Sequence, residues 1–191
     1  MPTRTLRLPP LPPSPVVLLL IDFVNPLRFD GAQRLRAAAV DAANATAKLR
    51  RQARSARAQT IYANDNYGEW RSDFKHLWAR CRASAGAPGA IARALPPRGD
   101  DFAILKPRHS AFYSTPLELL LQQLKCKRLI LTGIAADNCV LFTAMDAYLR
   151  GYELWIPEDC IAAESAQAKH QAIDQMRRVL KAHTQAASAA H

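Results

Sequence analysis

Residues 128–156, RLILTGIAADNCVLFTAMDAYLRGYELWI, decide the fold of this chain. The stretch begins with an apolar strand over 128–131 and turns at a glycine into a helix over about 137–150. Gly151 is typical of the position just after a helix, and 152–156 predict a second strand. Strands joined by a helix in this way lie parallel in one sheet.

The rest of the chain repeats this alternation. A short continuous apolar run over 16–21 is typical of a strand buried on both faces, and apolar residues spaced by three and four from Ala32 onward predict a long helix. The remaining expected strands are 59–63 and 102–105. The remaining expected helices are 74–81, 116–124 with Thr115 as its N-cap, and one carrying Ile173 to Leu180. Residues 84–99 are expected to be a connection without regular structure. We therefore predict an α/β protein: a three-layer α-β-α sandwich with a mostly parallel, Rossmann-like sheet.

Length and composition point to one globular domain. The chain has 191 residues, 49% of them hydrophobic and 22% charged, with seven glycines and four cysteines. These values exclude a disordered, collagen-like or disulfide-scaffold protein. The apolar run 16–21 is far shorter than the ~20 residues of a membrane-spanning helix, and the prolines between 9 and 15 argue against a signal peptide. We expect a cytoplasmic protein with reduced thiols and no membrane partner.

Charge bears on possible partners of the chain, and local composition bears on its division into segments. The formal net charge is +10, but the densest basic group, within 50–57, is interleaved with other residues on a predicted helix and indicates a solvated face. A nucleic-acid partner is therefore not expected. We predict a proline-rich arm over 1–15, a domain over 16–184 and a flexible alanine-rich tail over 185–191.

Three reactive side chains follow predicted strands, at the sheet edge where parallel α/β proteins bind ligands. They are Asp22, Lys106 and Cys139. A thiol at a helix start next to an ammonium is expected to favour the thiolate, and a carboxylate can move its proton. Backbone amides of the turn over 133–136 and of the helix start could bind a developing oxyanion.

Other residues offer alternative chemistry. Cys160 also follows a strand and is a competing nucleophile, whereas Cys81 lies on an apolar helix face and is expected in the core. His109 follows Lys106 by three residues and would allow a cysteine–histidine pair instead. The residues alone leave these alternatives open.

The motifs LLLIDFVNP (18–26), LKPRHSAFYSTPLE (105–118) and LILTGIAADNCVLFTAMDAYLRGYEL (129–154) resemble the isochorismatase-like cysteine hydrolases. That family includes nicotinamidases, N-carbamoylsarcosine amidases and ureidoacrylate amidohydrolases. The resemblance covers about residues 16–180 and implies an isochorismatase-like fold with Asp22, Lys106 and Cys139 as catalytic triad. It also implies a cis peptide between Ile134 and Ala135, an oxyanion hole made by the amides of Ala135 and Cys139, and a homo-oligomer.

One departure from the family bears on cofactors. Nicotinamidases carry an Asp-x-His metal site after the second strand, whereas this chain has Tyr67 two residues after Asp65. Because His76 alone cannot complete such a site, we expect no metal and no other cofactor. The side chains expected to bind substrate, with Phe23 and Trp70 stacking on a planar amide, are Phe23, Asn25, Asn64, Trp70, Phe112 and Ile134.

The reactive residues, together with what the resemblance implies, predict a cysteine-dependent hydrolase that cleaves a C–N bond of a small amide or ureido substrate through a thioester. Hydrolysis of an isochorismate-type vinyl ether is the alternative within enzymes. A binding protein with a retired site is the alternative outside them.

Overall fold

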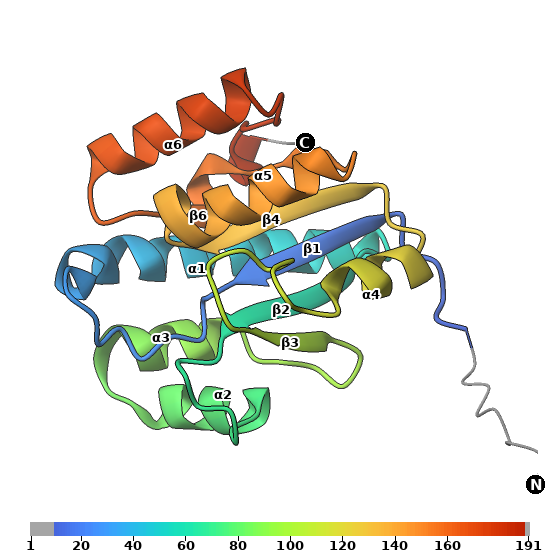
Figure 1. Cartoon of the computed structure of the whole chain (residues 1–191). Helices are drawn as coiled ribbons and strands as arrows, with labels where there is room; N and C mark the ends of the chain where they lie inside the picture. The colour runs from blue at the N-terminus through green and yellow to red at the C-terminus, as the bar shows by residue number, and fades with distance from the viewer. Residues whose placement is uncertain (1–9, 190–191) are drawn as a thin grey trace, which may run out of the picture.

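The computed structural model describes residues 10–189, which form a parallel sheet covered by helices on both faces (Figure 1). Its strand order is β3-β2-β1-β4-β5, and the short strand β6 pairs with β4. The strands are β1 Val16–Ile21, β2 Gln59–Asp65, β3 Phe102–Lys106, β4 Arg128–Ile134, β5 Glu153–Trp155 and β6 Ile161–Ala162. The predicted α/β class and sheet are confirmed.

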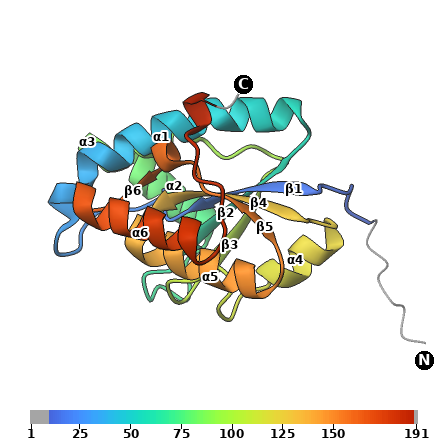
Figure 2. The ribbon, with the colours of Figure 1, turned by 90° about the horizontal axis from the view of Figure 1, so that it is seen from above.

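Two helical layers enclose the sheet, as the view from above shows (Figure 2). One face carries α1 Ala32–Ser55, α2 Phe74–Ala83 and α3 Gly86–Ala94; the other carries α4 Leu117–Gln123, α5 Leu141–Leu149 and α6 Ala166–Arg178. Central strand β1 serves both layers, because its side chains alternate between the two faces. Leu18 and Leu20 pack toward α1, whereas Leu19 and Ile21 pack in the opposite core.

Three local predictions need correction. Residues 84–99 contain helix α3, because Pro88 lies in its first turn, where no amide donor is needed, and Ile91 supplies a buried side chain. Strand β6 escaped prediction because two residues carry no periodicity. The helix expected from 137 begins with one π-helical turn, η1 (Ala136–Val140), before α5.

The chain ends are anchored where the structure describes them. Within the predicted tail, the amides of Ala187 and Ser188 donate hydrogen bonds to the Asp159 carboxylate, and Ala187 is buried. The flexibility of the tail stays a prediction. At the other end, the Ser14 amide donates to Leu124 O at 2.7 Å. Most of the predicted arm, residues 1–9, lies outside the described residues. Within 10–189, no helix has the length and apolar character needed to cross a membrane.

Gly133 in β4 is required by close packing against β1. Its φ is +137°, and a Cβ there would lie 2.0 Å from the carbonyl oxygen of Ile21. We expect Gly133→Ala to lower the free energy of unfolding by at least ~3 kcal/mol, measured by urea denaturation. Gly151→Ala is the matched control, because Gly151 also has positive φ (+79°) but open space around it. It is expected to cost only about 1 kcal/mol, and equal losses would contradict the packing argument.

Candidate active site

Three strand ends bring Asp22, Lys106 and Cys139 together at the carboxyl edge of the sheet. Asp22 follows β1, Lys106 is the last residue of β3, and Cys139 lies in η1 after β4. Strand β2 runs between β1 and β3 and positions the Asp22 carboxylate, because the Asp65 amide at the end of β2 donates to Asp22 Oδ1 at 2.7 Å. Asp22 itself has φ +52°, so the chain leaves the strand direction at this residue.

Lys106 is the centre of the cluster. Its Nζ lies 2.8 Å from Asp22 Oδ2 and 3.6 Å from Cys139 Sγ. It also donates to the Arg108 carbonyl at 3.2 Å and lies 3.8 Å from Asp65 Oδ2. The Lys106 side chain is fully buried, so these contacts replace the water that the ammonium loses.

Burial and neighbouring charge determine the protonation of the cluster. Burial raises the pKa of Asp22, and the charge of Lys106 opposes the rise. Burial acts to lower the pKa of Lys106, but the charge and hydrogen bond of Asp22, together with the charge of Asp65, oppose it and the net shift is upward. Burial, followed by the Asp22 charge, raises the pKa of the Cys139 thiol well above its ordinary value. These directions oppose the resting thiolate expected from the sequence, and Asp22 and Lys106 form an ion pair at 2.8 Å.

The turn before Cys139 is held in a defined geometry. The peptide bond between Ile134 and Ala135 is cis, as the resemblance implied. The carbonyl of Ala135 accepts hydrogen bonds from the amides of Asn138 and Val140, both at 3.1 Å. This places the start of η1, with the Cys139 amide, at the end of β4, where a substrate oxygen would meet the reactive side chains.

Thr143 is a supporting residue that the sequence did not single out. Its hydroxyl donates to the Cys139 carbonyl at 2.7 Å and accepts from the Ala111 amide at 3.0 Å. It therefore joins the helix bearing the thiol to the loop after Lys106. A threonine inside an apolar helix face was the only signal available.

A cavity of about 370 Å³ opens onto Cys139. Of the residues expected to bind substrate, Asn25 and Ile134 line it, together with Asp22, Ala135 and Cys139. The lining residues that sequence reasoning did not assign to substrate binding come from loops and from the ends of helices and strands: Phe29, Leu35, Asp65, Tyr67, His109, Asp137, Asn138 and Glu164.

Four other expected binding residues lie elsewhere. Phe23 and Phe112 are buried in the two cores, and Asn64 is fully buried, with its side-chain amide donating to the Val24 carbonyl at 2.8 Å. Trp70 is 79% exposed and lines a separate hollow of about 780 Å³. None of these four side chains lines the cavity at Cys139, so a role for them in substrate binding stays a prediction.

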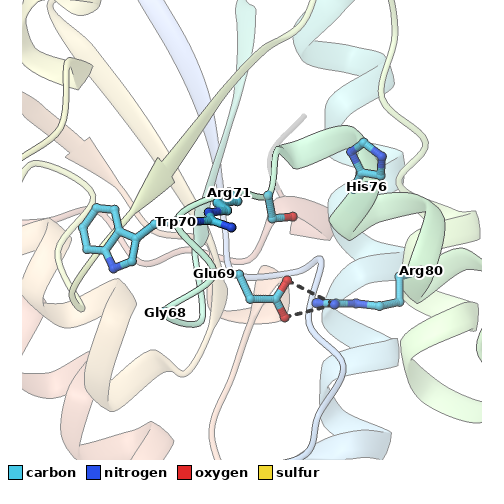
Figure 3. A pocket seen from close by; sticks show the side chains of 7 residues that line it. Gly68, Glu69, Trp70, Arg71, His76 and Arg80 are labelled. Atoms are coloured by element: carbon cyan, nitrogen blue, oxygen red, sulfur yellow. Dashed lines mark hydrogen bonds and ion pairs between the residues drawn. The ribbon is translucent and has the colours of Figure 1, made fainter.

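The hollow beside Trp70 does not contain the reactive cluster. Figure 3 shows Trp70 on one side of it and the Glu69–Arg80 ion pair on the other. Asp22, Lys106 and Cys139 are not among its lining residues. The smaller cavity at the strand ends is therefore the candidate active site.

The alternative nucleophile and base are placed differently. Cys160 is fully buried on the α1 face, and burial raises its pKa to about 12; Cys81 is in the core as expected. His109 lines the cavity, with Nδ1 4.0 Å from Cys139 Sγ and its ring stacked on Phe142. Geometry thus disfavours Cys160 and leaves His109 beside the thiol.

The loop after β2 does not provide a metal site. Among residues 10–189, no group of three or more histidine, cysteine or acidic side chains is arranged to hold a metal ion. Asp65 instead accepts a hydrogen bond from the Tyr67 amide at 2.6 Å. A metal-independent reaction stays a prediction.

The sequence and the structure of this chain are both similar to those of known proteins. The Isochorismatase domain model matches residues 16–188. The uncharacterised isochorismatase family protein YaaI of Bacillus subtilis is 38% identical over 163 residues, 85% of this chain and 89% of its own length. Ureidoacrylate amidohydrolase RutB of Methylorubrum extorquens is 43% identical over 63 residues, 33% of this chain and 25% of its own length. N-carbamoylsarcosine amidase from Thermoplasma acidophilum has a similar structure, with a TM-score of 0.68, 25% identity, and coverage of 90% of this chain and 95% of its own.

Proposed function

The chain belongs to the isochorismatase family of hydrolases, and on that premise we propose that it hydrolyses a C–N bond of a small amide or ureide with Cys139 as nucleophile. The observation that carries the proposal is the contact of Lys106 Nζ with both Asp22 Oδ2 and Cys139 Sγ at the cavity. A carboxylate and a thiol that share one buried ammonium are within reach of proton exchange. Relatives named for this kind of chemistry, RutB and N-carbamoylsarcosine amidase, support it.

The first half-reaction forms a thioester. Asp22 accepts the thiol proton, and Lys106 stabilises the sulfur as it attacks the carbonyl carbon. The amides of Ala135 and Cys139 stabilise the oxyanion, each donor contributing about 3 kcal/mol to the transition state. Asp22 then gives its proton to the departing nitrogen, the C–N bond breaks, and an amine or ammonia leaves.

The second half-reaction regenerates the enzyme. Asp22 accepts a proton from a water molecule, whose oxygen attacks the thioester carbon. The C–S bond breaks, the carboxylic acid leaves, and the proton returns to Cys139. The net reaction consumes one water and yields one acid and one amine, so no oxidant or cofactor is needed.

A panel of small amides and ureides tests this function. We expect ammonia release in steady state and, after rapid acid quenching, an acyl adduct on the Cys139 peptide by mass spectrometry. Turnover of a vinyl ether without cleavage of any C–N bond would favour the isochorismate-type alternative. Binding without turnover of any compound would favour a retired site. Location in the cytoplasm and assembly into a homo-oligomer stay predictions.

The pH dependence should report Asp22. Because burial raises its pKa above the ordinary 3.8, kcat/KM is expected to fall as pH decreases through that raised pKa, where protonated Asp22 can no longer accept the thiol proton. Lys106 has a raised pKa and stays charged, so little loss is expected from this residue up to about pH 9. The measurement is kcat/KM between about pH 4 and pH 9, with circular dichroism as a control for folding. An acid limb at or below 3.8 in folded protein would contradict the assignment.

A further inference from the structure

The cavity at Cys139 is acidic although the chain is strongly basic. Its lining includes carboxylates from four separate segments of a chain with a formal net charge of +10. These carboxylates are Asp22, Asp65, Asp137 and Glu164. Because like charges repel strongly at short range inside a protein, the local charge matters more to a ligand here than the net charge.

The two cations that contact carboxylates of this cavity, Lys106 and Arg34, are paired with them. Among the described lining residues there is no lysine or arginine. The ammonium of Lys106 lies behind the lining, held by Asp22 at 2.8 Å and close to Asp65. Arg34, outside the cavity, pairs with Glu164 at 2.5 Å. A substrate carboxylate inside the cavity would therefore meet carboxylates of its own sign, and the ammonium of Lys106 and the guanidinium of Arg34 already have counter-ions.

The helix starts at the cavity are also occupied by acidic residues. Glu164 lies at the start of α1, where the absence of a side chain at Gly31 makes room: a Cβ there would be 2.1 Å from Glu164 Oε2. Asp137 lies in the first turn of η1, which leads into α5. Helix N-termini are the usual backbone sites for anions. At the start of α1 the protein places its own Glu164 carboxylate there.

Two buried polar atoms of the cavity have no partner. The side-chain oxygens Asn138 Oδ1 and Tyr67 Oη are buried, and neither makes a hydrogen bond within the described part of the chain. An amide oxygen accepts and a phenol both donates and accepts. Since buried polar groups are normally satisfied, both atoms suit a ligand with N–H donors and a carbonyl acceptor.

We propose that this cavity selects uncharged or cationic amides and ureides and rejects those bearing a carboxylate, with Asp137 and Glu164 as specificity-determining residues. The proposal rests on the proposed hydrolase function and narrows its substrate class. It also separates this chain from the printed activity of one relative, because ureidoacrylate carries a carboxylate.

Two alkylating agents of the same size provide a direct test. Iodoacetamide and iodoacetate differ mainly in charge, and both modify thiols. We expect the iodoacetamide-to-iodoacetate rate ratio at Cys139 to be at least about tenfold higher in the folded protein than at the same cysteine in the urea-unfolded chain. Cys126 is an internal reference, because Lys125, Lys127 and Arg128 surround it in sequence. Rates are measured per cysteine by peptide mass spectrometry.

Substitutions test whether Asp137 and Glu164 cause the charge selectivity at Cys139. Combining Glu164→Gln with Asp137→Asn should lower the ratio at Cys139 by about fivefold or more, since this removes two negative charges and frees Arg34. Glu153→Gln is the matched control: Glu153 also pairs with an arginine, Arg128 at 2.6 Å, but at the opposite edge of the sheet. An unchanged ratio in the double variant, or an equal change in the control, would overturn the roles of Asp137 and Glu164.

A pair of substrates that differ in charge tests charge selection separately from the proposed hydrolase activity. Propylurea and 3-ureidopropanoate form a pair of similar size, uncharged and anionic, and we expect at least about tenfold lower kcat/KM for the anion. If both are cleaved equally well, or if iodoacetate is favoured at Cys139, charge selection is overturned and the hydrolase stands. If nothing in the amide panel is cleaved but the alkylation ratio holds, the selectivity stands and the hydrolase function fails.

Discussion

Cys139→Ala and Cys139→Ser are expected to lower kcat/KM for amide hydrolysis by about 10⁴-fold or more. Alanine removes the nucleophile. Serine keeps its size, but the alkoxide is far more costly to form than the thiolate, and Asp22 is a weak base for that proton. Because Cys139 is only partly buried, neither change leaves a large hole in the core. The checks are steady-state kinetics and urea unfolding of each variant.

The control for this prediction is Cys126→Ser. Cys126 is also partly buried, but it lies between α4 and β4, at the opposite edge of the sheet from the cavity. We expect this variant to keep wild-type kcat/KM. Full activity of either Cys139 variant would remove the nucleophile from the proposal, and loss of activity in Cys126→Ser would show that any thiol substitution is disruptive.

The convergence of the reactive groups was predictable because it follows from topology. Parallel strands end at one edge of a sheet, so Asp22, Lys106 and Cys139 could be placed at that edge from strand positions alone. Their protonation was not predictable in the same way. The pKa of Cys139 depends on how deeply the thiol is buried and how close Asp22 lies, and neither appears in the spacing of residues.

The cavity lining depends on backbone angles that the sequence does not reveal. Asp22 adopts φ +52°, so the alternation of β1 no longer applies at Phe23, whose ring packs in the core instead of facing a ligand. Tyr67 also has positive φ, in the loop that carries Trp70 away from the cavity. Docking of the tail depends on contacts between distant residues: Asp159 accepts from two tail amides, and Trp155 Nε1 donates to the Gln185 carbonyl at 3.0 Å. Such long-range pairings have no local signature.

The Asp22–Lys106 pair should show strong coupling in stability. Asp22→Asn leaves a fully buried ammonium with only the more distant Asp65 as counter-ion, and Lys106→Met leaves a buried carboxylate. Each single variant is expected to lose about 3–5 kcal/mol of unfolding free energy. The double variant leaves no charge unpaired, so its loss should be at least ~2 kcal/mol smaller than the sum of the two single losses. The measurement is a double-mutant cycle by urea denaturation. The matched pair is Arg128–Glu153, whose side chains are exposed, and its cycle should give less than about 1 kcal/mol.

Activity in the same variants separates the role of the pair in folding from its role in the reaction. All three variants should lose at least about 10³-fold in kcat/KM, because Asp22 moves the protons and Lys106 stabilises the sulfur. Recovery of stability without activity in the double variant is the expected signature, since uncharged Asn and Met satisfy packing but cannot exchange protons with Cys139. A double variant that regains both would make the ion pair purely structural, and the thiol would then need another base. His109, whose Nδ1 lies 4.0 Å from Cys139 Sγ, is placed to be that base, and His109→Gln in the double background would then abolish the remaining activity.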